Sequence, residues 1–189
     1  YIGNNQFRVL SHEGTINGAY AALEWLGKRV GVDVRRTLNT LSASLAGGDV
    51  SLLFMNGIGG LGAPYWLPDF ESEFLAAPGG ATTNVDSATE LQQIGAVVES
   101  IAFLIALNVF AMHRATPLQR LTITGGLAAC DYLCEVLAEV TQLPVARPTL
   151  REATSRGIAY LAAGQPSDWQ PIPIDKSFAP TGKHAVLDR

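Results

Sequence analysis

Residues 57–62, Gly-Ile-Gly-Gly-Leu-Gly, match the G-x-G-x-x-G pattern of dinucleotide-binding turns and follow an apolar run of strand length. In such a turn the third glycine begins a helix whose N–H groups face a pyrophosphate, and an acidic residue follows about 20 residues later. Here Pro64 and Pro68 interrupt any helix, and no strand ending in such an acid follows. We therefore exclude a Rossmann site and interpret the segment as a tightly packed loop that carries Tyr65 and Trp66.

A second turn contains Gly125 and Gly126, which follow a strand-like pattern ending at Thr124 and precede a helical one. Without a Cβ at two successive positions, the backbone can lie flat against a planar ligand, and the N-terminus of the next helix favours a phosphate. The same pair of glycines is also typical of close packing between a strand and a helix. From the residues alone, both interpretations stay open.

The three histidines are too few and too scattered for a metal site or a hydrolase relay. We expect His12, beside Glu13, at a solvated strand end. We expect His113 at a helix C-terminus, where it complements the helix dipole. His184 lies in the C-terminal tail. The histidines therefore predict no metal site and no hydrolase relay in this chain.

The only two cysteines, Cys130 and Cys134, lie one helical turn apart and have no second Cys/His pair that could complete a zinc site. We interpret them as reduced thiols in the core of a cytosolic protein. On the same predicted helix, Asp131, Glu135 and Glu139 follow an i, i+4, i+8 spacing. This spacing favours a solvated stripe rather than a catalytic pair of carboxylates.

Composition limits the class of protein. The 189 residues, 48% of them hydrophobic, can form a sizeable core in one compact domain. Only 16% are charged, so apolar surface is left for a second domain or for a second copy of the chain in a homo-oligomer. The net charge of -4 and the scattered lysines and arginines argue against a nucleic-acid partner.

The longest apolar stretch, residues 101–112, is shorter than the roughly 20 residues that span a membrane, so we expect a buried helix and no membrane partner. The first residues have neither a basic region nor an apolar one, as a secretory signal would. They also lack an initiator methionine. We expect a cytoplasmic protein whose chain begins before these residues.

Strand and helix patterns alternate along the chain, which predicts an α/β architecture with a mixed sheet. The expected elements are a strand at 7–11, helices at 13–30 and 34–45, a strand at 50–55, a loop at 56–80, a helix at 91–112, a strand at 118–124, a helix at 127–141, a strand at 144–146 and a helix at 151–163. Capping boxes are predicted at Asp86-Ser87 with Glu90 and at Thr149 with Glu152, and Gly31 is a predicted helix stop. In such folds ligands lie where strands end, here after Met55 and after Thr124.

Five motifs occur in the order found in the C-terminal domain of the FGGY family of carbohydrate kinases, which this chain resembles over about residues 13–180. The family includes glycerol kinase and the pentulose kinases, and residues 60–66 resemble the glycerol kinase loop. The motifs are Glu13-Gly14 with Ala21-Ala22 and Trp25-Leu26; residues 60–66; residues 99–103; Thr124-Gly125-Gly126 with residues 143–148 and 152–164; and residues 177–180.

The resemblance implies an actin-like ATPase (ribonuclease H-like) domain, a mixed sheet flanked by helices, at residues 1–164, with an extended arm at 165–189. In the family, the γ-phosphoryl group of ATP passes to a sugar or polyol hydroxyl with Mg²⁺, largely through positioning and charge stabilisation. The catalytic Asp and most sugar contacts belong to an N-terminal domain, which is absent from this chain. We therefore expect the chain to bind ATP or ADP and to be inactive without that domain.

Carried over by position, Gly125 and Gly126 would lie against the adenine and its ribose. Tyr20 and Glu24 occupy positions where glycerol kinase has a Gly and a Gln near the nucleotide, and Cys130 occupies that of an adenine-contacting Asn. A tyrosine can stack on a base and a thiol can line an apolar slot, but both lose hydrogen bonds specific to adenine. We expect loose recognition of adenine.

Two alternatives stay open. The loop at 60–66 favours glycerol as substrate, whereas residues 74–77 and Cys130 depart from glycerol kinase and favour a pentulose or another ketose. The altered residues Tyr20, Glu24 and Cys130 also suggest a protein of another class, a kinase-like binding or regulatory protein that transfers no phosphate.

Overall fold

The computed structural model describes residues 2–3, 8–9, 11–38, 41, 52–76 and 85–182. The strands are β1 (Ile2–Gly3), β2 (Arg8–Val9), β3 (Leu52–Met55), β4 (Glu73–Ala76), β5 (Leu121–Thr122), β6 (Val145–Pro148) and β7 (Ile174–Phe178). The helices are α1 (Ala19–Val30), α2 (Val34–Leu38), η1 (Val85–Ser87), α4 (Glu90–Ala115), η2 (Gly126–Ala129), α5 (Asp131–Thr141) and α6 (Ala153–Ala162), where η denotes a 3₁₀ helix.

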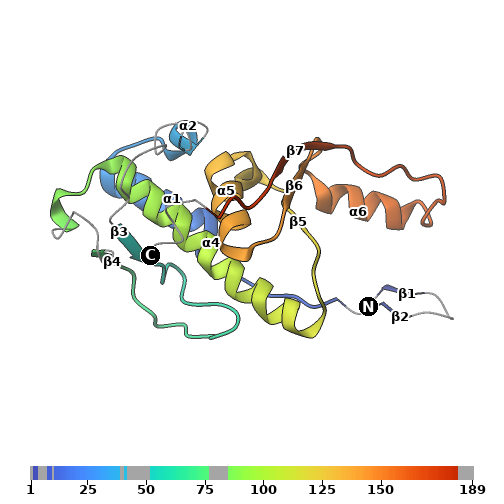
Figure 1. Ribbon diagram of the computed structural model, residues 1–189, viewed down its shortest axis with the longest axis horizontal. Coiled ribbons are helices and arrows are strands. Elements are labelled where there is room, and N and C mark those ends of the chain that lie inside the picture. The colour runs from blue at the N-terminus through green and yellow to red at the C-terminus, as the bar shows by residue number, and fades with distance from the viewer. Residues whose placement is uncertain are drawn as a thin grey trace.

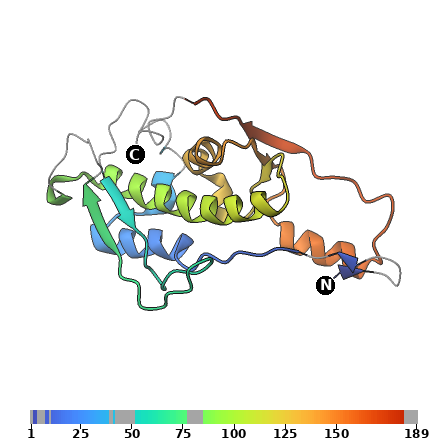
Figure 2. The ribbon, with the colours of Figure 1, turned by 60° about the horizontal axis from the view of Figure 1, so that its bottom comes forward.

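Helix α4 runs through the middle of the molecule, with α1 on one side and α5 on another (Figures 1 and 2). Because it is covered from two directions, every residue from 94 to 102 is buried, including polar ones. By length and composition this helix could cross a membrane, but 67% of its most apolar window is buried inside the domain. It is a core helix, as the sequence predicted.

The N-terminus of α4 differs in detail from the prediction. Its N-cap is Thr89, whose side chain accepts a hydrogen bond from the N–H of Gln92, and the Gln92 side chain accepts one from the N–H of Thr89. The capping box expected at Asp86-Ser87 is therefore wrong, since these two residues belong to η1. The second predicted box is also wrong, because Glu152 precedes α6 without any side-chain cap.

Strands β5, β6 and β7 form a mixed sheet, in which β6 pairs parallel to β5 and antiparallel to β7. All four residues of β6 are buried, since α5 packs against this strand. Strand β7 lies in the segment expected to be an arm without periodicity. Four of its five residues are exposed, which explains why no alternating pattern marks it.

A second, two-stranded sheet pairs β3 with β4 in antiparallel register, from Leu52 opposite Ala76 to Met55 opposite Glu73. The sequence predicted only loop at 56–80, so β4 is a correction. Like β7 it is mostly exposed and has no clear alternation. The ring of Phe54 packs against those of Trp25 and Phe74, with centroids 5.5 and 4.6 Å away, and these contacts connect the hairpin to α1.

Helix α1 begins at Ala19 rather than at the predicted residue 13. The preceding backbone is used in tertiary hydrogen bonds instead: the carbonyl of Thr15 accepts from Ala63 N–H at 2.8 Å, and that of Gly18 accepts from Asn56 Nδ2 at 3.0 Å. The helix ends at Gly31, as predicted, in the left-handed conformation with φ of 75°.

The glycine-rich loop at 57–62 packs tightly, as predicted. A Cβ added to Gly57 would lie 2.2 Å from the carbonyl oxygen of Phe70, and one on Gly62 would lie 2.1 Å from that of Thr15. Both glycines are therefore required by close backbone approach. No helix begins within this loop, in agreement with the exclusion of a dinucleotide turn.

Two other predicted elements are shorter or interrupted. The expected helix at 127–141 is divided into η2 and α5 by Cys130, which has extended backbone angles of -79° and 104°. The expected strand at 118–124 is reduced to β5. Parts of the predictions at 7–11, 34–45, 50–55 and 165–189 lie outside the described residues.

Candidate functional site

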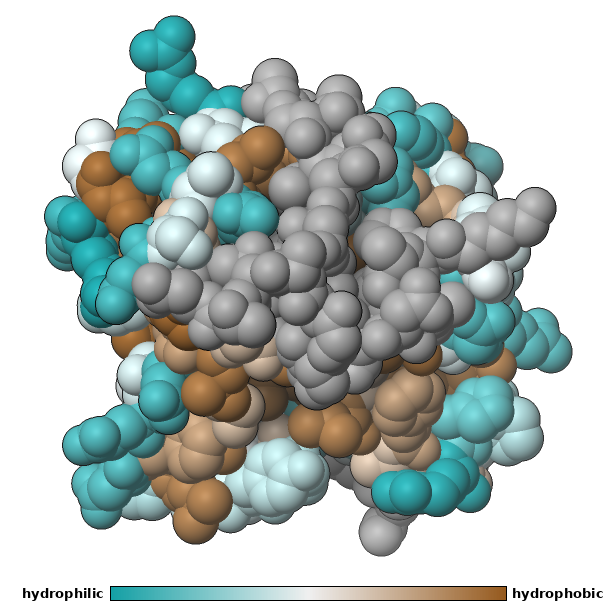
Figure 3. Space-filling model, turned by 60° about the vertical axis from the view of Figure 1, so that its left-hand side comes forward, coloured by the Kyte–Doolittle hydropathy of each residue, from teal (hydrophilic) through white to brown (hydrophobic). Residues whose placement is uncertain are grey.

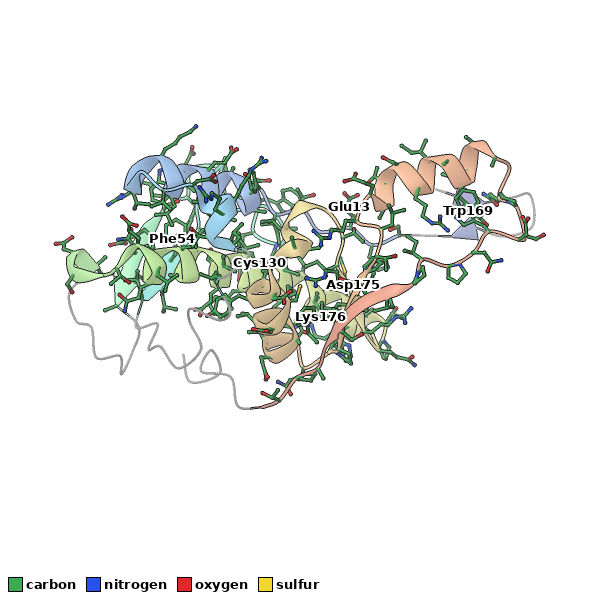
Figure 4. All side chains as sticks on the ribbon, turned by 90° about the horizontal axis from the view of Figure 1, so that it is seen from above. Glu13, Phe54, Cys130, Trp169, Asp175 and Lys176 are labelled. Atoms are coloured by element: carbon green, nitrogen blue, oxygen red, sulfur yellow. The ribbon has the colours of Figure 1, made fainter. Side chains whose placement is uncertain are left out.

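A cavity of about 470 Å³ lies between α1, α2 and the turn that follows β5. Its lining residues are Tyr20, Arg35, Leu38, Gly126, Leu127, Ala129 and Cys130. A second cavity of about 300 Å³, which includes Glu24, adjoins it and shares Tyr20 and Arg35. The volumes lie in the range of small-molecule sites. Figure 4 shows Cys130 near the middle of the molecule, beside α2 and the start of α5.

Four of the five residues expected from the sequence thus surround two adjoining cavities. Tyr20, Gly126 and Cys130 line the larger one, and Glu24 lines the smaller one. Gly125 lines neither. The structure therefore brings together segments about 100 residues apart in the sequence.

The two glycines of the turn have different local roles. Gly125 has a φ of 85°, which side chains rarely adopt, and its N–H donates to the carbonyl of Arg151 at 2.9 Å. Gly126 has no such constraint and begins η2. A Cβ added at either position would meet nothing within 4 Å, so open space lies in front of this backbone.

Helix α1 presents Tyr20 and Glu24 one turn apart, and both line the smaller cavity together with the buried Leu23. Arg35, from α2, lies over the Tyr20 ring with its Cζ 5.1 Å from the centroid, and its Nε donates to the Tyr20 hydroxyl. This hydrogen bond raises the pKa of Arg35 above its ordinary value, so the cation persists. No sequence pattern indicated Arg35, because α2 is short and carries no motif.

Cys130 and Cys134 are both free and buried, in agreement with the predicted core thiols. Burial raises the pKa of Cys130 above its ordinary value and that of Cys134 to about 12. Both thiols are therefore protonated at neutral pH. Cys130 supplies a neutral, weakly hydrogen-bonding wall to the larger cavity.

A network of charged groups contacts the turn after β5 and stabilises it. Arg147, only 8% exposed, donates through Nη1 to the carbonyl of Ala128 at 3.0 Å and to Asp131 Oδ1 at 2.6 Å. Its Nε donates to Asp175 Oδ2 at 3.1 Å, and Lys176 donates to the other oxygen of Asp131 at 2.6 Å. Figure 4 shows Asp175 and Lys176 on β7, beside α5. The network ties η2 and α5 to the sheet.

The predicted solvated stripe on α5 is wrong. Burial alone would raise the pKa of Asp131, but its hydrogen bonds to Lys176 and Arg147 outweigh burial, and the pKa lies below its ordinary value. Glu139 is buried and accepts hydrogen bonds from the N–H groups of Thr181, at 2.6 Å, and Gly182, at 3.0 Å. These carboxylates hold the C-terminal segment against α5.

His12 and His113, the histidines that the structure describes, line neither cavity. His12 and Glu13 are exposed and follow β2 without belonging to it, and Figure 4 shows Glu13 away from Cys130. His113 Nδ1 accepts a hydrogen bond from Leu118 N–H at 3.0 Å, which connects the last turn of α4 to the segment before β5. His184 lies outside the described residues.

Comparison with known proteins gives a family match over most of the chain. Residues 4–165 match the family model described as the FGGY family of carbohydrate kinases, C-terminal domain. A glycerol kinase of Trichlorobacter lovleyi is 35% identical over 164 residues, which are 84% of this chain and 31% of that protein. A glycerol kinase of Synechocystis is 28% identical over 177 residues, 93% of this chain and 34% of that protein. The chain therefore spans about a third of these relatives.

Solved structures give the same fold. Plasmodium falciparum glycerol kinase, solved with ADP, matches with a TM-score of 0.71 and 18% identity over 88% of this chain and 33% of that one. A ligand-bound xylulose kinase of Lactobacillus acidophilus matches with a TM-score of 0.71 and 18% identity over 92% of this chain and 36% of that one. At these identities the likeness concerns the α/β fold.

Proposed function

This chain belongs to the FGGY family of carbohydrate kinases and has the actin-like ATPase fold of its C-terminal domain, and we propose that it is the nucleotide-binding part of an ATP-dependent sugar or polyol kinase. The observation that carries the proposal is the cavity between α1, α2 and the turn after β5. Tyr20, Gly126 and Cys130 are brought to this cavity from two distant segments.

In this proposal the base of the nucleotide enters the cavity beside the open backbone of Gly126. Leu127 and Cys130 supply apolar and weakly polar walls, and the ring of Tyr20 offers a surface for stacking. The network around Arg147 keeps the turn in place while the base binds.

Magnesium would arrive with the nucleotide. Within the described ranges, no group of three or more His, Cys, Asp or Glu is placed to hold a metal. This is compatible with Mg²⁺, which commonly binds through substrate phosphates, waters and one or two carboxylates. When bound, Mg²⁺ neutralises the phosphate charge.

We propose that residues 1–164 form the domain and 165–189 an arm, whose strand β7 completes the sheet, and that a separate N-terminal domain supplies the catalytic Asp and the sugar contacts. The chain's share of its relatives, about a third, supports such a partner. Helix α6 also has no buried residue and exposes Ile158 to 63%. We propose that this apolar surface faces the N-terminal domain, without which the chain transfers no phosphate.

We further propose a cytoplasmic protein that binds neither membranes nor nucleic acid and has apolar surface available for a homo-oligomer. Hydrophobic side chains gather in the lower part of the face seen in Figure 3. Among the described residues, large exposed hydrophobic side chains include Met55, Trp66, Leu67 and Phe110. The buried thiols agree with a reducing compartment.

Calorimetric titration with Mg-ADP tests the nucleotide site. In Gly126→Trp the indole can occupy the cavity without a clash at Cβ, so we expect at least about tenfold weaker binding than in the wild type. Gly157→Trp is the matched control, because Gly157 lies on exposed α6 and its added Cβ also meets open space. Equal affinity in wild type and Gly126→Trp would contradict the proposed site.

A further inference from the structure

Tyr20 and Arg35 line both of the adjoining cavities, and their side chains are in contact. The Arg35 guanidinium lies over the Tyr20 ring, with its Cζ 5.1 Å from the centroid, and its Nε donates to the Tyr20 hydroxyl. The pair therefore lies where the larger cavity meets the smaller one. A base cannot stack on this face of the tyrosine ring while the guanidinium covers it.

The two side chains differ in how firmly they are held. Tyr20 is partly buried and packs against the hydrophobic core, which fixes the position of its ring. Arg35 is exposed and lies on the short helix α2. An exposed guanidinium has only weak contacts with an aromatic ring and a neutral hydroxyl, and an arginine gains rotamer freedom when it is released. Arg35 is therefore the side chain of this pair that can move.

The smaller cavity offers Arg35 a second position. Glu24 and Asp33 line this cavity together with Arg35, and their carboxylates attract the guanidinium. A guanidinium that leaves the Tyr20 ring on this side stays close to opposite charge. The ring that it uncovers faces the larger cavity, beside Gly126 and Cys130.

We propose that the Arg35 side chain is a lid on the base-stacking face of Tyr20. The lid covers the ring in the empty site and moves toward Glu24 and Asp33 when the adenine base enters. This proposal rests on the nucleotide site proposed above and describes how that site opens for its nucleotide. Because only molecules with an open lid bind the base, the closed lid lowers the apparent affinity by the fraction of molecules that are open.

Calorimetric titration of the 189-residue chain with Mg-ADP tests the lid through Arg35→Ala. This variant leaves the Tyr20 ring uncovered, so we expect it to bind Mg-ADP about three- to tenfold more tightly than the wild type. Loss of a positive charge would by itself weaken the binding of a polyanion, so tighter binding would not be a charge effect.

Arg36→Ala is the matched control. It removes the same charge from the next residue of α2, which is exposed and lines neither cavity. Because exposed charges contribute little, its affinity for Mg-ADP should lie within about twofold of the wild-type value.

Tyr20→Phe tests the same contact from the other side. It keeps the stacking ring and removes the hydroxyl that holds Arg35, so Mg-ADP should bind about two- to threefold more tightly. A hydroxyl that contacted the nucleotide would give a loss of affinity instead. The double variant Tyr20→Phe with Arg35→Ala should bind no more tightly than Arg35→Ala, because both changes act on one contact.

An NMR signal reports the movement directly in the wild type. The Nε–H resonance of Arg35 should shift when Mg-ADP binds, since its hydrogen bond to Tyr20 breaks as the lid opens. Calorimetry and this resonance together separate a lid from a residue that only stabilises α2.

The outcomes distinguish this inference from the nucleotide site on which it rests. The lid is wrong if Arg35→Ala binds Mg-ADP no more tightly than the wild type, if Arg36→Ala tightens binding equally, if Tyr20→Phe weakens it, or if the Nε–H resonance of Arg35 does not move at saturation. In each of these cases the nucleotide site stands as long as Gly126→Trp weakens binding. If neither the wild type nor Arg35→Ala binds Mg-ADP, or if Gly126→Trp binds it unchanged, the nucleotide site itself is wrong and this inference with it.

Discussion

Replacing Arg147 with methionine removes three hydrogen bonds while keeping an unbranched apolar side chain over Phe178. The arginine donates to the carbonyl of Ala128 and to the carboxylates of Asp131 and Asp175. In the wild type its Cζ lies 5.5 Å from the centre of the Phe178 ring, a contact that a methionine can partly replace.

The free energy of unfolding should fall by about 2–3 kcal/mol. Breaking a fully buried ion pair costs about 3–5 kcal/mol, whereas exposed pairs contribute about 0–1 kcal/mol. Arg147 is buried, but the side chain of Asp131 is 34% exposed, so the pair lies between these limits. The buried carbonyl of Ala128, which loses its donor, contributes about 1 kcal/mol of the loss.

The effect should depend on pH in a defined direction. Because the pKa of Asp131 is lower in the folded protein than in the unfolded chain, its contribution is fully present above the unfolded value of about 3.9. This contribution to stability is lost as the pH falls through the pKa that Asp131 has in the folded protein. The difference in stability between wild type and Arg147→Met should therefore be complete at pH 7 and should narrow as the pH falls below about 4.

Urea unfolding followed by circular dichroism measures this difference, and a melting temperature lower by roughly 4–12 °C should accompany it. Lys176→Met is the control, because Lys176 donates to the other oxygen of Asp131 but its side chain is 46% exposed. For that variant we expect the free energy of unfolding to fall by at most about 1 kcal/mol. If Arg147→Met loses no more stability than Lys176→Met, the network does not hold the turn as argued.

Three further variants or reactions follow from the described contacts. Tyr132→Phe removes the hydroxyl that donates to buried Glu99, and we expect about 1–3 kcal/mol less stability in urea unfolding; an unchanged midpoint would contradict this. Gly62→Ala places a Cβ 2.1 Å from a carbonyl oxygen and should lower the free energy of unfolding by about 1–3 kcal/mol. In Gly126→Ala the added Cβ meets open space, so the free energy of unfolding should change by less than about 0.5 kcal/mol. Both cysteines should resist thiol labelling at pH 8 until urea unfolds the chain, because burial raises their pKa values, that of Cys134 to about 12; rapid labelling of the folded protein would refute this.

The elements that could be predicted are those with a buried, periodic face. Helix α1 repeats apolar residues at Leu23 and Leu26, and α4 is mostly apolar over residues 94–109, where it is covered from two sides. Strands β4 and β7 could not be predicted, since most of their residues are exposed. Their extended conformation depends on pairing with strands that are distant in the sequence. Pairing across the fold leaves no local pattern in the sequence.

The site could be predicted only in part. Family resemblance selected Tyr20, Gly126 and Cys130, and the structure places all three around one cavity; their contact with a nucleotide stays a prediction. Arg35 was missed because its place opposite the turn depends on how α2 packs, and α2 has no motif. Arg147 was missed as a positioning residue because its partners lie 16 to 28 residues away in other elements.

An amide NMR titration of the 189-residue chain with Mg-ADP tests most directly whether this domain binds a nucleotide between α1, α2 and the turn after β5. The account predicts shifts that cluster at residues 125–130 and 20–24 and disappear in Gly126→Trp. Absence of shifts at millimolar nucleotide, or saturating shifts confined to another surface such as the β3–β4 hairpin, would contradict it.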